Sequence, residues 1–559
     1  MGRTRLLLGC LASALLLLAL VGCGAAEAPT ATPAPTPTPI VAQPKYGGVM
    51  NVAQRGDPAS WDPMAINIFT AVGLSHPLYG EGNLVKNCRD NIYQVCPSLA
   101  ERWEANADFT QWTFKIRDNA YWHDGKPFTA EDAKFWVDLS VNGAPPDRKP
   151  AYFKANFDPL VKTEALDGNR FRVTLAKPRP GYLEALIEIG NQIAHPKHLV
   201  EPELQKGNKT VGPQEINWVA TGPFKMLKYD KGAVVQYRKF DKYWEKDERG
   251  RQLPFLDGID FPIIKEPSAM VAAFRTGRID TTAKGSGFHL TPEAKDQIAK
   301  DLGDKVYFVN IPYLAESITP NSLRTPWNDV RLRKALSLYM DRQAGIQSIY
   351  GGFAELSTFW APNSPWVNPD FRTWPGYNPA TKEKDRAEAK RLLTEAGYPN
   401  GFKTTLMCRD LWVKWCEFLE GQLTGLLGQG NVTIDVVDTA KRGARIATGD
   451  FDIHPDSYFS LFPTEGVSDF LTTNPNADVK HNDKKVDEYF DRLLTVTSFE
   501  EKVKLSREIE RYILQQQYLT TYTWYQWAVL AFRSYVKGVA FPAQNSALLT
   551  DFVTTWMDK

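Results

Sequence analysis

The 559-residue chain lacks the short signatures that identify common enzyme classes. It has no GxSxG nucleophile elbow, no HExxH zinc motif, no GxxxxGK[ST] phosphate loop and no glycine fingerprint for dinucleotides behind a strand. Basic residues are not in excess, because 66 Lys and Arg face 65 Asp and Glu, so electrostatics give no reason to expect nucleic acid. The sequence therefore predicts a protein that is not an enzyme and has no cofactor and no metal.

Long apolar runs are also scarce, and the one that exists lies at the N-terminus. Two arginines precede a leucine-rich stretch over residues 6–20, which is too short for a comfortable membrane span and is typical of an export signal. The following Leu20-Val21-Gly22-Cys23 resembles a bacterial lipobox, in which cleavage before the cysteine frees it for lipid attachment. The alternative is a plain secretory signal with an incidental cysteine. We expect a lipoprotein signal peptide over residues 1–22 and lipidation at Cys23.

The composition of the segment that follows the signal, residues 23–45, favours an extended chain. Residues 23–45 are rich in Ala, Pro and Thr and have almost no large apolar side chains, so we expect a tether. Two or three acyl chains, at about 0.8 kcal/mol per buried methylene, anchor a protein firmly. No later run is long enough to cross a bilayer. The sequence thus predicts an exported protein, anchored by lipid to the outer face of the cell membrane.

Cysteine is rare in the remaining chain and occurs as two pairs with the same spacing. Cys88 and Cys96 are eight residues apart, as are Cys408 and Cys416. An exported protein meets oxidising conditions, so we favour two local disulfides over four unpaired thiols. Neither pair has the CxxC spacing of zinc sites or thioredoxin-like motifs.

The body alternates between strand and helix patterns. Trp112, Phe114 and Ile116 point to one side of a segment with period-two alternation, which indicates a half-buried strand. Thr129, followed by acidic residues, is typical of a helix N-cap, and Ser498 opens a capping box for a helix to about residue 516. Alternating strands and helices predict an α/β fold.

Three groups of polar residues are candidates for reactive sites. His123-Asp124 lies between a strand and a helix cap, which favours a turn over a catalytic relay. His195 and His198 are separated by a proline that spoils a regular helical face, which argues against a metal site. Asp452 and Asp456 have a spacing that a glycosidase pair could use, but such pairs occur by chance in a chain of this size.

Seven segments, in order, resemble one known family. "PSLAERWEANADFTQWTFKIRDNAYWHDGKPFTAEDAKF" is similar to the signature segment of extracytoplasmic solute-binding proteins, family 5, the oligopeptide-, dipeptide- and nickel-binding receptors of ABC importers. The other matching segments are "YGGVMNVAQ", "TGPFKMLKYDKG" with "FDKYW", "AFRTGRID", "NDVRLRKALSLYMDR", "LLTEAGYPNGF" and "SYVKGV".

The resemblance implies a two-lobed periplasmic-binding-protein clamshell of the large type II form, with a hinge near residues 308 and 526. It also implies a monomeric receptor that closes on a solute and docks on a membrane permease driven by a cytoplasmic ATPase. It assigns lobe I to residues 46–82, 217–308 and 527–559, an additional domain on lobe I to 83–216, and lobe II to 309–526.

The resemblance is weaker where it bears on the solute. Peptide-binding members carry a Trp-x-x-Asp-Tyr segment whose aspartate pairs with the peptide's ammonium. In this chain Tyr458 aligns with the tryptophan, Leu461 with the aspartate and Phe462 with the tyrosine. A buried ammonium without a counter-charge costs several kcal/mol, so zwitterionic peptides lose support. Asp456 is a substitute if the register slips.

Aromatic residues favour a second class of solute. Flat rings flanked by amides suit sugar faces, so oligosaccharides or glycosides are the alternative to oligopeptides. Packing in the core is the other interpretation of these tryptophans, and we assign Trp112 and Trp122 to it. Trp412 and Trp415 face either the cleft or the interior of lobe II. An extracytoplasmic hydrolase and a surface receptor without a transport role are the rivals from other classes. The candidate cleft residues are Trp61, Tyr313, Asn321, Trp327, Trp360, Trp524 and Trp527.

Overall fold

The structure is a computed structural model, in which a compact body spans Pro44–Lys559 and is separate from Met1–Gln43. The signal peptide, Cys23 and nearly all of the tether lie outside the described residues. No helix in the described part of the chain combines the length and apolarity that a bilayer crossing requires. The described residues are 43–58, 61, 74, 76–80, 82–144, 157, 159–188, 194–208, 211–282, 290–458, 460–474, 477–540 and 552–559.

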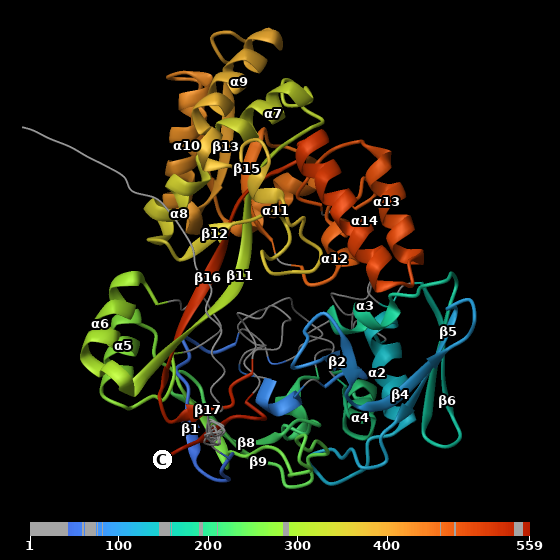
Figure 1. Cartoon of the computed structure of the whole chain (residues 1–559). Helices are drawn as coiled ribbons and strands as arrows, with labels where there is room; N and C mark the ends of the chain where they lie inside the picture. Colours follow the sequence, from blue (N-terminus) through green and yellow to red (C-terminus); the bar gives the residue numbers. More distant parts are fainter. Residues whose placement is uncertain are drawn as a thin grey trace, which may run out of the picture. The chain divides into compact units, whose positions relative to one another are not determined.

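Two four-stranded sheets form what we call the lower half, as drawn in Figure 1. The first has the order β1-β10-β9-β8, in which β1 is parallel to β10 and the remaining pairs are antiparallel. Its strands are β1 (Val49–Asn51), β8 (Phe224–Asp230), β9 (Val234–Lys239) and β10 (Gly258–Pro262), accompanied by helices α5 (Pro267–Arg275) and α6 (Pro292–Leu302).

The second sheet of the lower half confirms the alternation found in the sequence. Trp112, Phe114 and Ile116 are all buried, and Thr129 caps α2 through a complete capping box with Asp132. The sheet has the order β4-β5-β7-β6 and is antiparallel throughout. Its elements are β4 (Ala100–Ala105), β5 (Gln111–Ile116), β6 (Leu160–Leu166), β7 (Arg170–Leu175), α2 (Ala130–Asn142), α3 (Tyr182–Glu188) and α4 (Lys197–Gln205), beside a hairpin of β2 (Val85–Asn87) and β3 (Val95–Pro97).

A mixed six-stranded sheet with its helices forms the upper half. The order is β12-β16-β11-β15-β13-β14. The strands are β11 (Val306–Pro320), β12 (Ala354–Leu356), β13 (Thr404–Arg409), β14 (Val432–Val437), β15 (Ile453–Tyr458) and β16 (Thr521–Arg533). The helices are α7 (Val330–Tyr339), α8 (Arg342–Tyr350), α9 (Lys382–Glu395), α10 (Val413–Leu427), α11 (Thr439–Thr448), α12 (Pro463–Ser468), α13 (Lys484–Thr495) and α14 (Phe499–Arg511).

The helix predicted from Ser498 is confirmed. The side chain of Ser498 accepts a hydrogen bond from the amide of Glu501, and α14 continues through a π-helical turn over Tyr512–Gln516. The predicted end near residue 516 therefore coincides with the end of this turn.

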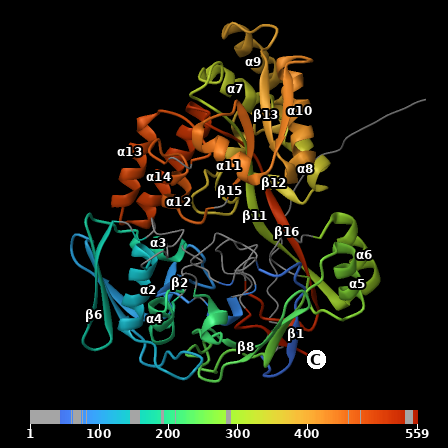
Figure 2. The same ribbon diagram turned by 180° about the vertical axis from the view of Figure 1, so that it is seen from behind.

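One long antiparallel pair joins the two halves. β11 and β16 pair from Val306 opposite Arg533 to Ile318 opposite Thr521, and both views show them running from the lower half into the upper half (Figures 1 and 2). The predicted chain crossings near residues 308 and 526 fall inside these strands. The assignment of residue ranges to lobes stays a prediction.

Both cysteine pairs are bonded. Cys88–Cys96 closes the turn between β2 and β3, and Cys408–Cys416 ties the end of β13 to the first turn of α10. Each bond braces a single local turn.

Candidate functional site

The carboxyl ends of three parallel strands meet at one edge of the upper sheet. β13 is parallel to both β14 and β15, so Arg409, Val437 and Tyr458 end their strands on the same side. Helices α10 and α11 begin close after β13 and β14. In open α/β sheets ligands bind at the carboxyl ends of the strands, so this edge is a candidate binding site.

Four carboxyl groups gather near this edge and form what we call the acidic cluster: Asp456, Glu465, Asp469 and Asp478. They come from β15, α12, the residue after α12 and the loop before α13. Arg442 of α11 contacts two of them, at 2.8 Å to Asp456 Oδ1 and 3.3 Å to Asp478 Oδ1. These residues lie on different segments between positions 442 and 478, and the fold brings their side chains together.

Enclosure and mutual repulsion raise the pKa values of Asp456, Asp469 and Glu465 in the acidic cluster. Burial raises the pKa of Asp456 well above its usual range, and a hydrogen bond with Asp478 adds to the effect. Burial, followed by the charge of Asp478, raises the pKa of Asp469 to about 7. Burial, followed by the charge of Asp469, raises the pKa of Glu465 to about 8. Glu465 and Asp469 therefore hold protons near neutral pH.

Two carboxyls of the acidic cluster nevertheless reach solvent. The side chain of Asp456 is 13% exposed and that of Asp478 is 32% exposed. A carboxyl with a raised pKa that still reaches solvent, as Asp456 does, is positioned to lose its proton when a cation approaches. The arrangement favours a positively charged ligand group.

Glu465 lies beside the position that the sequence singled out as lacking a charge. The backbone amide of Leu461 donates to Glu465 Oε2 at 3.4 Å, and the hydroxyl of Tyr458 donates to the backbone carbonyl of Glu465 at 3.2 Å. The carbonyl of Leu461 accepts a hydrogen bond from Trp366 Nε1 at 2.8 Å. Phe462 is buried and precedes α12. A carboxyl thus stands next to Leu461, supplied from four residues further along.

Three candidate tryptophans pack inside the upper half. Trp327, Trp360 and Trp524 are 1%, 0% and 0% exposed. Trp327 donates to Thr404 Oγ1 at 3.0 Å, and the indole of Trp524 donates to the carboxyl of Glu316. The structure therefore gives these rings packing partners, and their contact with a ligand stays a prediction.

The other aromatic candidates are divided between the two halves. Trp61 belongs to the core of the lower half and meets Trp218 edge-on at 4.9 Å. Tyr313 and Trp527 are half-buried on β11 and β16, the strands that join the halves. In the turn preceding α10, Trp412 is also half-buried, while Trp415 is buried. The half-buried rings keep an accessible face.

Asn321 lies at the other end of β11. Its side-chain amide donates to the carbonyls of Gly449 and Phe451 at 2.9 and 3.2 Å, which fixes a turn. Because β11 runs antiparallel to β15, Asn321 sits at the edge of the sheet opposite Tyr458. It lines a separate pocket of about 410 Å³.

The histidine and aspartate pairs have structural roles. His123 lies in the predicted turn, and its ring contacts the carbonyl of Gly222 at 3.0 Å, while Asp124 pairs with His198 at 2.7 Å. Burial lowers the pKa of His123 to about 4, which keeps the ring neutral. Asp452 accepts from the amide of Thr405 at 2.9 Å. Within the described ranges, no three His, Cys, Asp or Glu side chains are grouped to hold a metal.

Sequence reasoning missed most of the acidic cluster. Asp456 is named there as a substitute for Leu461, but Glu465, Asp469 and Asp478 are not named, nor is Arg442, which contacts the cluster. The available signal was the pair of acids after β15, at positions 465 and 469. Their spacing alone does not show whether the two side chains enter one cavity or lie on opposite faces of a short helix.

Comparison with known proteins identifies the family and the fold. Residues 94–476 match the middle region of bacterial extracellular solute-binding proteins, family 5. The chain is 27% identical over 363 residues to the glutathione-binding protein GsiB of Pectobacterium atrosepticum, covering 64% of each protein. It is 28% identical over 356 residues to the periplasmic oligopeptide-binding protein OppA of Salmonella typhimurium, covering 61% of each. The matches thus span less than two thirds of these curated relatives.

A solved structure shows the fold. The periplasmic binding protein DppA of Helicobacter pylori, in complex with the peptide STSA, aligns with a TM-score of 0.72 at 22% identity, over 92% of this chain and 99% of that one. The two-lobed clamshell expected from the sequence is confirmed. The relatives named above are binding proteins rather than enzymes. The chain belongs to the bacterial extracellular solute-binding proteins, family 5.

Proposed function

We propose that this chain is the lipid-anchored receptor of an ABC importer, which captures oligopeptides between its two halves and delivers them unchanged to a membrane permease. The family supports the receptor role, and Cys23 within its lipobox-like segment supports the anchor. The observation that carries the choice of peptides is the acidic cluster, because a peptide's ammonium needs a carboxylate partner when it is buried.

Glu465 supplies the carboxyl that is missing at Leu461, the position of the family's aspartate. Leu461 cannot pair with an ammonium, but its amide lies against the Glu465 carboxyl. When an ammonium enters, its charge favours loss of the Glu465 proton, since an opposite charge nearby lowers the pKa of a carboxyl. Binding of the amine and ionisation of the cluster then support each other.

Capture requires only a difference in affinity between two arrangements of the halves. A solute that contacts both halves stabilises the closed arrangement to the extent that its contacts are better there. Among the aromatic residues expected to line a sugar site, three are fully packed in the core, which leaves oligosaccharides with less support than peptides.

A calorimetric titration tests the proposal. We would titrate the mature protein with tri- to pentapeptides, with the same peptides acetylated at the N-terminus, and with cello-oligosaccharides. Free-amine peptides should bind, and acetylation should weaken binding by at least about 100-fold, since a lost buried charge pair is worth about 3 kcal/mol or more. Recovered peptides should have unchanged mass.

Glu465→Gln should abolish most of this discrimination. The matched control is Glu488→Gln, which changes an exposed residue on α13. Equal affinity for free and acetylated peptides, preferential binding of the sugars, or cleavage of a bound peptide would contradict the proposal.

A further inference from the structure

We propose that the β2–β3 hairpin, closed by Cys88–Cys96, is a rigid arm whose tip residue Tyr93 fastens the two halves together and positions the segment around Trp366 beside the site. The inference rests on capture by closure, and it assigns Tyr93 as a positioning residue.

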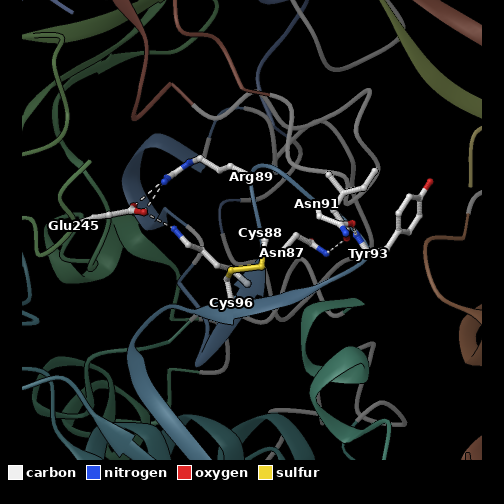
Figure 3. Close-up of a disulfide and its surroundings, with 9 residues drawn as sticks. Asn87, Cys88, Arg89, Asn91, Tyr93, Cys96 and Glu245 are labelled. Carbon is white, nitrogen blue, oxygen red and sulfur yellow. Dashed lines mark hydrogen bonds and ion pairs between the residues drawn. A yellow bond between two sulfur atoms is a disulfide. The ribbon is translucent and has the colours of Figure 1, made fainter. Parts of the chain in front are cut away.

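The arm is held rigid at its tip. The disulfide closes the turn, the side-chain amide of Asn87 donates to the carbonyl of Ile92 at 2.7 Å, and Asn91 Oδ1 accepts from the amide of Tyr93 at 3.1 Å (Figure 3). These links leave the tip residues little freedom to move relative to the strands. Tyr93 is therefore presented in one direction.

The arm is also fixed at its base. Glu245, from the loop after β9, accepts hydrogen bonds from Lys86 at 2.7 Å and from Arg89 at 2.5 Å (Figure 3). The side chains of Lys86 and Glu245 are only 7% and 9% exposed. Burial alone would raise the pKa of Glu245, but Lys86 and Arg89 outweigh it and bring that pKa to about 2. The carboxylate stays ionised and ties the arm to the lower half.

Tyr93 at the tip contacts the upper half. The ring of Tyr93 lies edge-on to that of Trp366, with centroids 6.0 Å apart, and its hydroxyl is hydrogen-bonded to Ser364. Trp366 in turn donates to the carbonyl of Leu461. Through Trp366, the arm is thus connected to Leu461, the residue beside Glu465.

A second contact spans the halves at another point. Lys502 of α14 pairs with Glu184 of α3, and the two side chains are 8% and 18% exposed. One continuous hydrophobic cluster includes Phe114 of the lower half and Phe359 of the upper half. These contacts exist only while the halves are together, so they favour closure whether or not a solute is present.

The contacts that Tyr93 makes set the expected change in the ratio of closed to open protein when Tyr93 is removed. An edge-on aromatic pair and a hydrogen bond each shift an equilibrium by about two- to tenfold. Removal of Tyr93 should therefore lower the ratio of closed to open protein by about tenfold or more. Freeing the tip by removing the disulfide should have a smaller effect in the same direction.

The test uses the mature, ligand-free protein, so it does not depend on the identity of the solute. Variants Tyr93→Ala, Tyr93→Phe and Cys88→Ser/Cys96→Ser are compared with Cys408→Ser/Cys416→Ser, which removes the other disulfide. Small-angle X-ray scattering reports opening, and hydrogen–deuterium exchange reports the segment 364–368.

We expect a larger radius of gyration and about tenfold faster exchange at 364–368 for Tyr93→Ala, with partial rescue by Tyr93→Phe, which keeps the ring. Cys88→Ser/Cys96→Ser should change both readouts in the same direction, and the control pair should change neither. Wild-type scattering and exchange in Tyr93→Ala would overturn the proposal even if Cys88→Ser/Cys96→Ser fails to fold. Failure to bind peptides would leave these readouts unchanged, so the two proposals fail separately.

Discussion

Replacing Glu465 by glutamine should change how the stability of the ligand-free protein depends on pH. The folded protein raises the pKa of Glu465 from 4.5 to about 8, chiefly by burial and then by the charge of Asp469. The folded state thus binds this proton more tightly than the unfolded state, and stability is lost as pH rises from about 4.5 to about 8. At about 1.4 kcal/mol per pKa unit, the loss from this residue amounts to about 5 kcal/mol at most.

Glutamine has no proton to lose, so the variant should avoid this loss. Near pH 5 the two proteins should differ by about 1 kcal/mol or less, because the glutamate is protonated there. At pH 8.5 the Glu465→Gln protein should be more stable by about 2–5 kcal/mol. The difference between the proteins is the quantity to follow, because other groups contribute to each curve. His123, for example, acts in the opposite sense, since burial lowers its pKa to about 4.

Urea denaturation at intervals from pH 5 to 8.5 measures this difference directly. Glu488→Gln on the exposed face of α13 should give a constant difference from the unmodified protein across the same range. A Glu465→Gln difference that is equally flat would show that the carboxyl is ionised in the folded protein at neutral pH, and the reasoning about the acidic cluster would fail.

Two further substitutions test the packing around the site and the base of the arm. Gly466→Ala should lower the free energy of unfolding by about 1–3 kcal/mol, because the added Cβ would lie 2.3 Å from the buried ring of Trp360. Gly443→Ala is the control: its Cβ would have nothing within 4 Å, so it should stabilise its helix by about 0.5–1 kcal/mol. Calorimetric melting should show shifts of opposite sign, and two equal shifts would contradict the packing argument. Glu245→Gln should cost about 3–5 kcal/mol at pH 7, because it leaves Lys86 buried without its counter-charge. The unmodified protein should lose this contribution as pH falls from about 4.5 through 2, so a urea midpoint for Glu245→Gln that matches the unmodified protein at pH 7 would refute the assignment.

The local elements could be predicted because their causes are local. The alternation of Trp112, Phe114 and Ile116 depends only on which side of one strand is buried, and the caps at Thr129 and Ser498 depend on residues within one turn. Both kinds of signal are contained in a few consecutive letters. The clamshell itself came from resemblance, since no local pattern specifies how two sheets are joined.

The acidic cluster could not be predicted in this way. It forms because β15 lies between β11 and β13, which brings Arg442 and Asp478 to the same strand end as Asp456. That order requires knowledge of how β15 pairs with β13 and with β11, which lies more than a hundred residues earlier in the chain. The alignment placed Leu461 at the position of the family's aspartate, but it could not show that Glu465 folds back toward the amide of Leu461.

The burial of individual tryptophans also could not be predicted from the sequence. Composition indicated a surplus of aromatic rings but not which of them are enclosed. Trp524 is buried partly because Gly345 leaves room for it, since a Cβ at that glycine would lie 2.2 Å from the ring. Such complementarity between distant residues is visible only in the fold.

Capture by closure can be measured in one titration that combines scattering with mass spectrometry. A free-amine peptide that binds in calorimetry is added to the mature protein, the radius of gyration is recorded at each step, and the peptide is then recovered. The contacts between the halves leave part of the ligand-free population open, and the peptide closes that part. We therefore predict a saturable decrease in the radius of gyration, in parallel with occupancy, and a peptide of unchanged mass. Saturable binding with no change in the radius of gyration, or a peptide that returns cleaved, would contradict the account.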